Sequence, residues 1–249
     1  MSSDPAPINL THHFLIAMPG LNDELFGKSV VYLCEHSARG ALGLIINKTA
    51  DLGLGELFDR LELRLRREDL RRAPLFRGGP VQTERGFVLH EALGEVLPVG
   101  SDETPPAIRD AIREALLQLN RVAGPAADEP AESAESAESG APADEEPAPA
   151  LPSAYASSLR IPGGLEMTTS RDVLEAISSG AGPRKVLVAL GYSSWGEGQL
   201  ESELAENSWL TVAADPAVIF DTPVEQRYEK AMALLGLEPW MLAPGSGRA

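Results

Sequence analysis

The sequence contains a single cysteine, Cys34, among 249 residues. One cysteine excludes an internal disulfide framework and any metal site that needs several thiolates from one chain. No apolar run approaches the roughly 18 residues that a membrane-spanning helix requires. No Lys or Arg precedes Lys28, so the basic start of a secretory signal is also missing. We therefore expect a cytoplasmic protein.

Positive charge is scarce, with 21 Lys and Arg against 37 Asp and Glu, for a net charge of −16. Eight of the acids lie in residues 125–152, which contain no Lys or Arg, so the rest of the chain is nearer −8. Nucleic-acid affinity comes largely from neutralising phosphates, and this balance argues against a broad cationic surface. It also disfavours binding to anionic membranes.

Large apolar side chains are almost absent from residues 123–156, which include a threefold Ala-Glu-Ser repeat. Such a composition cannot offset its ordering entropy by burial. We expect a disordered acidic insertion at about 123–156, interrupting a single domain that spans residues 1–249.

Short apolar runs predict strands, and apolar residues spaced near 3.6 predict helices. The predicted strands cover residues 14–18, 29–34, 42–46, 86–90, 165–168, 186–190 and 218–220. The predicted helices cover residues 54–67, 105–122, 170–177, 199–209 and 224–235. The end of the first helix stays open, because leucines there also fit a period of two. The loop at 37–40 predicts an antiparallel hairpin. Together these elements predict an α+β fold.

Three glycines punctuate the stretch between the strand at 186–190 and the helix at 199–209. A strand–turn–helix unit of this kind can cradle phosphate at the helix N-terminus. The lysine of a P-loop is missing, however, and Glu197 and Glu201 stand where positive charge is needed, so we exclude that site. We expect Glu203 to face water and the aromatic residues Tyr192 and Trp195 to pack the turn, with Gln199 bonding backbone. An exposed Trp195 would instead indicate a binding surface.

Cys34 and His36 end a predicted strand, where alternation places them on one face. An imidazolium beside a thiol stabilises the thiolate, which would make Cys34 a candidate reactive or redox-sensing residue. The alternative is a small buried cysteine and a histidine bonded to backbone.

Arg77 and Arg85 flank a glycine turn that contains Gly78, Gly79 and Gln82. Two guanidinium groups around such a turn could hold a phosphate or carboxylate. The alternative is a hairpin turn whose arginines pair with acids such as Glu84.

Residues 60–72 hold the main concentration of basic side chains, six arginines with acidic residues interleaved. A solvated segment with ion pairs explains this pattern, and a local nucleic-acid patch is the alternative.

The four histidines lack the spacing of a metal site, and no Ser-His-Asp order, paired-carboxylate motif or dinucleotide fingerprint occurs. We expect no metal, no cofactor and no catalytic residues, and the pattern favours a protein that is not an enzyme while leaving catalysis open.

Several stretches resemble the bacterial YqgE/AlgH family, also called UPF0301 or DUF179. They are FLIAMPGLNDELFGKSVVYLCEH, GALGLIINK, FRGGPVQTERGFVLH, MTTSRDVLEAI, ALGYSSWGEGQLESELAENSWL and FDTP. The resemblance implies a mixed, partly barrel-like sheet flanked by helices. It also implies a role as a transcriptional regulator and supplies no catalytic residues.

The leading interpretation is a non-enzymatic cytoplasmic binding protein of this uncharacterised family, with a role as a regulator. Its expected surface combines the Arg77–Arg85 turn, the strand end at Cys34 and His36, and the loop with Tyr192, Trp195 and Gln199. A thiol-dependent protein using Cys34 and a nucleic-acid binder using residues 60–72 are the alternatives. The partner, protein or nucleic acid, stays open, and no membrane is expected.

Overall fold

The computed structural model describes residues 9–21, 23–92 and 155–237, and the fold is α+β. The predicted helix at 105–122 and nearly all of the predicted acidic insertion lie outside these residues. Tyr155 and Ala156, at the end of that predicted insertion, are described, and Ala156 is bonded to Asp172 and Thr168. Within the described ranges, no helix is long and apolar enough to cross a membrane.

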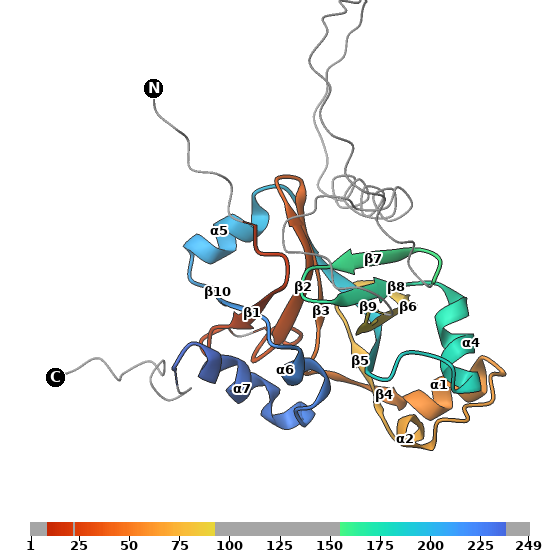
Figure 1. The fold of residues 1–249 in the computed structure, drawn as a ribbon. Helices are drawn as coiled ribbons and strands as arrows, with labels where there is room; N and C mark the ends of the chain where they lie inside the picture. Colours follow the sequence, from red (N-terminus) through yellow and green to blue (C-terminus); the bar gives the residue numbers. More distant parts are fainter. Residues whose placement is uncertain (1–8, 22, 93–154, 238–249) are drawn as a thin grey trace, which may run out of the picture.

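A mixed, curled sheet, partly barrel-like, organises the molecule (Figure 1). Its main path runs β10-β1-β2-β3-β9-β6-β8-β7, and β4 and β5 attach beside β9. All described strand pairs are antiparallel except β5 with β9. The strands are β1 His13–Ala17, β2 Val30–Ser37, β3 Gly40–Ile45, β4 Thr49–Gly53, β5 Pro74–Arg77, β6 Val81–Glu91, β7 Ser158–Ile161, β8 Leu165–Thr168, β9 Val186–Trp195 and β10 Trp209–Ala213.

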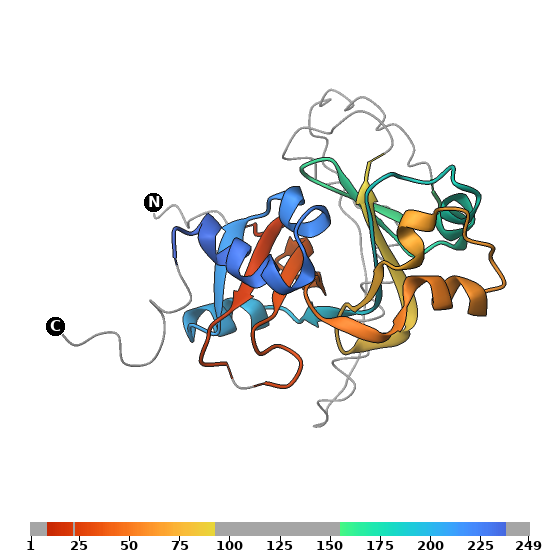
Figure 2. The ribbon, with the colours of Figure 1, turned by 90° about the horizontal axis from the view of Figure 1, so that it is seen from below.

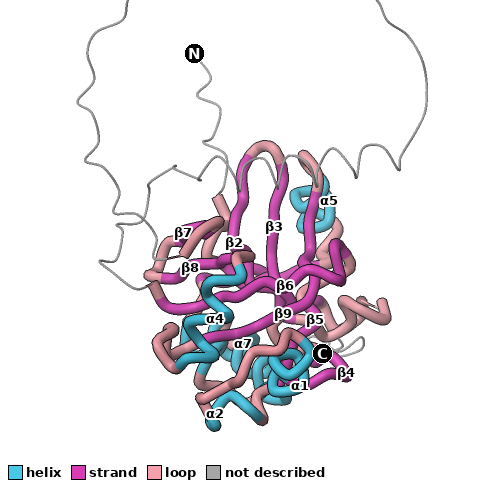
Figure 3. The backbone as a smooth tube through the Cα atoms, turned by 90° about the vertical axis from the view of Figure 1, so that its right-hand side faces the viewer, coloured by secondary structure: helices cyan, strands magenta, loops and turns pink. Residues whose placement is uncertain are grey.

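Helices cover the sheet from two sides (Figure 2). The helices are α1 Leu54–Arg60, α2 Glu68–Arg71, α4 Arg171–Ser179, α5 Gln199–Ala205, α6 Pro216–Phe220 and α7 Arg227–Leu234, with a short 3₁₀ turn, Val224–Gln226, before the last. Figure 3 shows α4 and α1 on the same side of β9. The helices α6 and α7 lie across the first strands, where Met232 is fully buried with Phe14 and Ile16.

Most predicted strands are confirmed, including the β2–β3 hairpin, in which Ser37 pairs with Gly40. The prediction of a strand at 218–220 is wrong, because these residues lie in α6. Asp215 caps that helix by accepting a hydrogen bond from the Ala217 N–H at 2.9 Å, and Pro216 occupies its first turn. In α6, the cap and the proline in the first turn together outweigh the strand propensity of Val218 and Ile219.

The stretch around β9 also differs from its prediction. The strand continues to Trp195 through Gly191, whose φ of 71° bends it without ending it. Helix α5 stops at Ala205, Asn207 adopts a positive φ, and Trp209 begins β10 opposite Ala17. The end of the predicted helix is therefore a turn that leads into the edge strand β10.

The first predicted helix is also shorter than expected. Helix α1 ends at Arg60, and Glu62 adopts a positive φ of 58°. The chain is then extended up to α2, and Leu65 is buried there, so the period-two reading of these leucines is the correct one for this part.

Candidate binding site

The glycine turn between β5 and β6 packs on β9. The Gly78 N–H donates to the Leu190 carbonyl at 2.8 Å, and a Cβ on Gly78 would lie 2.2 Å from the Gly191 carbonyl oxygen. A Cβ on Gly79 would meet the Tyr192 backbone at 2.2 Å. These glycines permit a close backbone crossing. They are buried, so they form no open cradle for an anion.

The two arginines of this turn have separate partners. Arg77 forms an ion pair with Asp51 at 2.8 Å, not with Glu84. Arg85 donates to the Thr169 hydroxyl at 3.0 Å and to Gln82 at 3.4 Å. Each guanidinium is held by its own neighbours, so the expected bidentate anion site receives no support from these contacts.

A pocket of about 390 Å³ lies at the end of β9, and we call it the Trp pocket. Its apolar wall consists of Leu21, Phe26, Pro80, Val81, Trp195 and Trp209. Its polar lining consists of Asp23, Ser194, Gln199, Glu203 and Ser208. The pocket thus joins the loop after β1, the β5–β6 turn, the end of β9 and helix α5. It contains two of the predicted surface residues, Trp195 and Gln199.

Three aromatic rings pack against one another in this wall. The Trp195 and Trp209 rings meet edge to face, with centroids 6.0 Å apart. Phe26 lies 5.6 Å from Trp209 and 6.4 Å from Trp195. Asp23 positions Phe26, because its Oδ1 accepts hydrogen bonds from the Leu25 and Phe26 N–H groups. Edge-to-face packing of this kind makes the wall rigid.

Glu203 is the polar centre of the Trp pocket. Its Oε2 accepts hydrogen bonds from the Trp195 indole at 2.9 Å and the Trp209 indole at 2.7 Å. Its Oε1 accepts from the Gln199 amide at 3.0 Å, one helical turn away on the same face of α5. Gln199 in turn accepts from the Gly196 N–H at 3.0 Å, which fixes the turn before the helix. All three donors to the carboxylate are neutral.

Tyr192, another predicted surface residue, does not join the pocket. Its ring packs against Phe87, with centroids 5.2 Å apart, in the core cluster beneath α6 and α7. Trp195, three residues later, belongs to a different cluster that includes Leu200 and Trp209. The two aromatic side chains of this motif therefore serve different parts of the molecule.

The predicted thiol site is divided by the fold. Register shifts between Leu33 and Glu35, so strict alternation fails and the expectation that Cys34 and His36 share a face is wrong. Cys34 is 1% exposed in the core, where burial raises the pKa of its thiol, with a smaller contribution from Glu35. The His36 ring accepts from the Leu10 N–H and bonds Glu201 at 2.9 Å. A protonated, buried thiol is unsuited to nucleophilic chemistry.

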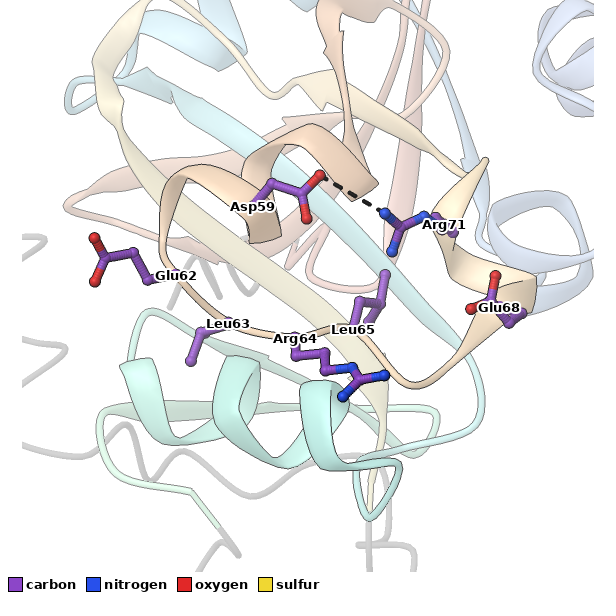
Figure 4. A pocket seen from close by; sticks show the side chains of 7 residues that line it. All are labelled: Asp59, Glu62, Leu63, Arg64, Leu65, Glu68 and Arg71. Atoms are coloured by element: carbon purple, nitrogen blue, oxygen red, sulfur yellow. Dashed lines mark ion pairs between the residues drawn. The ribbon is translucent and has the colours of Figure 1, made fainter.

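The arginine segment, residues 60–72, also borders a pocket, which we call the arginine pocket (Figure 4). Asp59, Glu62 and Glu68 line it together with Arg64 and Arg71, and Arg71 lies 3.8 Å from Asp59.

Arg67, in the same segment, is occupied by structural contacts. It donates to the carbonyls of Pro183 and Arg184 and pairs with Asp69. The basic side chains are thus mixed with acids, as the ion-pair interpretation predicted.

Among the described residues, no group of three or more His, Cys, Asp and Glu could hold a metal ion.

Comparison with known proteins places this geometry in a family. The AlgH-like family model, DUF179, matches residues 14–121 and 111–240. A UPF0301 protein of Paracidovorax citrulli is 62% identical over the full length of both chains, and one of Variovorax paradoxus is 57% identical over the same extent. The chain belongs to the AlgH-like family.

Solved structures of similar proteins agree with this assignment. The solution structure of the AlgH protein from Pseudomonas aeruginosa is 35% identical, covers both chains completely and has a TM-score of 0.61. Protein DIP2367 from Corynebacterium diphtheriae is 16% identical over 93% of this chain and 88% of its own, with a TM-score of 0.53. The second likeness shows the fold alone. The expected mixed, partly barrel-like sheet of the AlgH-like family is confirmed.

Of the residues that line the Trp pocket in this AlgH-like chain, the predicted surface included only Trp195 and Gln199, and Glu203, Phe26 and Asp23 are the main residues that it missed. Glu203 was expected to face water, whereas it accepts both indole N–H groups. Phe26 and Asp23 come from a loop far away in sequence, so no local pattern indicates their contact with α5. The spacing of Gln199 and Glu203 by four residues was the one available signal.

Proposed function

We propose that this AlgH-like protein is a non-enzymatic cytoplasmic binding protein that recognises a ligand in the Trp pocket. The observation that carries the proposal is the pocket itself, about 390 Å³ with a mostly apolar aromatic wall and a few converging polar groups. Ligand sites typically combine these properties and span roughly 300–1,000 Å³.

The polar groups of the pocket support binding more than catalysis. Glu203 and Gln199 are joined by a hydrogen bond, and among the described residues neither pairs with a histidine, lysine or cysteine that could move a proton or attack a substrate. The one thiol of the chain lies in the core with a raised pKa. Rigid aromatic rings around a fixed carboxylate recognise shape and charge.

The regulatory role expected from the family resemblance follows, in this proposal, from ligand binding and not from contact with DNA. The net charge of −16 opposes association with phosphates. In the arginine segment, Arg67 and Arg71 face carboxylates at 2.6 and 3.8 Å. These pairings engage two of the six arginines of the segment.

A fragment screen by two-dimensional NMR on the uniformly labelled full chain tests the proposal. The library should contain equal numbers of cationic, anionic and neutral fragments. The indole N–H signals of Trp195 and Trp209, assigned with single Trp→Phe variants, report on the pocket. We expect bound fragments to shift these signals and to compete with one another, and Val81→Phe, which narrows the pocket, to abolish the shifts.

Shifts confined to other parts of the chain, or fragments that bind Val81→Phe as well as the wild type, would contradict the proposal. A screen without hits in any of the three classes would contradict it too. The circular dichroism spectrum of Val81→Phe should match that of the wild type, and the wild-type shift map decides if it does not.

A further inference from the structure

The Trp pocket carries negative charge without a basic residue in its lining. Glu203 and Asp23 line it, and none of its described lining residues is Lys, Arg or His. The three hydrogen-bond donors to Glu203 are indole and amide N–H groups, which are neutral. Among the described residues, Glu203 forms no ion pair. Its charge is therefore solvated by dipoles alone.

Glu203 also retains hydrogen-bonding capacity. A carboxylate offers about four acceptor positions. Two at Oε2 are filled by the tryptophans and one at Oε1 by Gln199, so Oε1 can accept one more hydrogen bond. One acceptor position of the pocket, at Glu203 Oε1, thus awaits a donor.

We infer that the Trp pocket binds an organic cation, a guanidinium or alkylammonium group on an aliphatic stem. This inference rests on the proposed function. The cationic head donates to Glu203 Oε1, and Asp23 adds negative charge at an exposed part of the lining. The stem packs against Phe26 and Val81. Charge-assisted hydrogen bonds are the strong ones, and the apolar wall strengthens them by lowering the local dielectric.

The negative charge and the apolar surface of the Trp pocket exclude two other ligand classes, anions and neutral apolar molecules. An anion would face two carboxylates, Glu203 and Asp23, without a counter-charge, and like charges repel strongly at low dielectric. A neutral apolar ligand would desolvate Glu203 Oε1 without supplying a donor for its last acceptor position, which is costly. A cation supplies that donor.

Three probes of matched shape test the inference on the full chain. They are n-butylguanidinium, its neutral analogue n-butylurea, and the anion pentanoate. We expect n-butylguanidinium to shift the Trp195 and Trp209 indole signals saturably and to bind about tenfold or more tightly than n-butylurea, with pentanoate silent. Added salt should weaken the guanidinium and leave the urea unchanged.

Variants separate the carboxylate from the shape of the pocket. Glu203→Gln keeps the side-chain volume and should reduce the preference for guanidinium over urea to about threefold or less. Glu206→Gln, on the exposed end of α5, should leave it unchanged. If Glu203→Gln fails to fold, the three probes on the wild type decide alone.

The outcomes distinguish this inference from the proposed function. Equal binding of n-butylurea and n-butylguanidinium in the pocket overturns the cation preference and leaves the proposed function standing. Binding of pentanoate overturns it as well. Silence of all three probes, with hits in the fragment screen, overturns the cation alone, whereas silence in both experiments overturns both proposals.

Two further probes distinguish the source of the cation. Agmatine represents a free metabolite, and an acetylated, amidated Gly-Arg-Gly peptide represents an arginine of a protein partner. Tighter binding of agmatine assigns the pocket to a small amine, and tighter binding of the peptide assigns it to a protein. Failure of both to compete with n-butylguanidinium would overturn the inference.

Discussion

In the Trp pocket the Glu203 carboxylate is held by two indoles and an amide, whereas in the arginine pocket the Asp59 carboxylate faces the Arg71 guanidinium. Both pockets contain acidic side chains, and the second has more of them. The difference is that the second pocket places two arginines among its acidic side chains, and its charged residues are exposed. A count of charges therefore says little about a site, and the partners of each charge say much.

The largest effect is expected from Glu203→Ala. Removal of the carboxylate leaves two partly buried indole N–H groups without their acceptor, whereas the exposed Gln199 amide can bond water. Each unsatisfied buried donor costs about 1–3 kcal/mol, so we expect a loss of roughly 3 kcal/mol in the free energy of unfolding. Urea denaturation measures it. Glu206→Ala on the same helix is the control and should stay within about 0.5 kcal/mol. A loss for Glu203→Ala as small as that of the control would contradict the role of Glu203 as the hydrogen-bond acceptor of both indoles.

A second test concerns Arg67 in the arginine segment, residues 60–72. Arg67 has more hydrogen bonds to the rest of the chain than the other arginines of that segment have. It donates to the carbonyls of Pro183 and Arg184 at 2.7 and 3.0 Å, tying the segment to the loop before β9. We expect Arg67→Ala to cost about 1.5 kcal/mol and Arg71→Ala less than about 0.5 kcal/mol, since exposed pairs contribute little. Urea denaturation of both variants checks the ranking, and equal costs would contradict it.

Whether an element could be predicted from the sequence depends on whether its cause is local or non-local. Strands β2 and β3 were predicted because short apolar runs joined by a glycine-containing loop determine them locally. The length of β9 could not be predicted, because Gly191 remains in the strand only through its packing against the glycines of the β5–β6 turn. The helix α6 was missed since its cap, Asp215, was not weighed against the β-branched residues that follow.

The site was less predictable than the fold. Trp195 and Gln199 were named from the motif, and the structure places both in the Trp pocket. Glu203 was assigned to solvent, because helical periodicity cannot show that a second tryptophan returns on β10 to meet it. The burial of Cys34 agrees with the general tendency of free cysteine, while the bulge beside it left no sequence signal.

A smaller effect concerns protonation at the arginine segment. The hydrogen bond from Arg67 is the main cause that lowers the pKa of Asp69. A carboxyl group whose pKa is lowered on folding stabilises the folded state at pH values above its ordinary pKa. This contribution disappears as the pH falls through the folded-state pKa. Asp69 is 61% exposed, so we expect only a few tenths of a kcal/mol. Carboxyl NMR titration should find its pKa below the ordinary value of an aspartate in the wild type and closer to that ordinary value in Arg67→Ala. An unchanged pKa of Asp69 in Arg67→Ala would contradict the effect of Arg67 on this carboxyl group.

The smallest effect is expected from reversing charge in the arginine pocket. Arg64→Glu with Arg71→Glu should change the free energy of unfolding by less than about 1 kcal/mol, as exposed charges do. The pair should also leave DNA binding at the wild-type level, which we expect to be undetectable in titrations with single-stranded and duplex DNA at low salt. Salt-sensitive binding by the wild type that the double variant abolishes would instead support the nucleic-acid alternative.

A crystal structure of the full chain soaked with n-butylguanidinium is the most direct test of the comparison between the two pockets. Both pockets contain carboxylates, so the cation can bind in either one. The account predicts the guanidinium in the Trp pocket, within hydrogen-bonding distance of Glu203 Oε1 and with its butyl group against Phe26. Occupation of the arginine pocket, beside Glu62 or Glu68, with the Trp pocket empty would contradict the account.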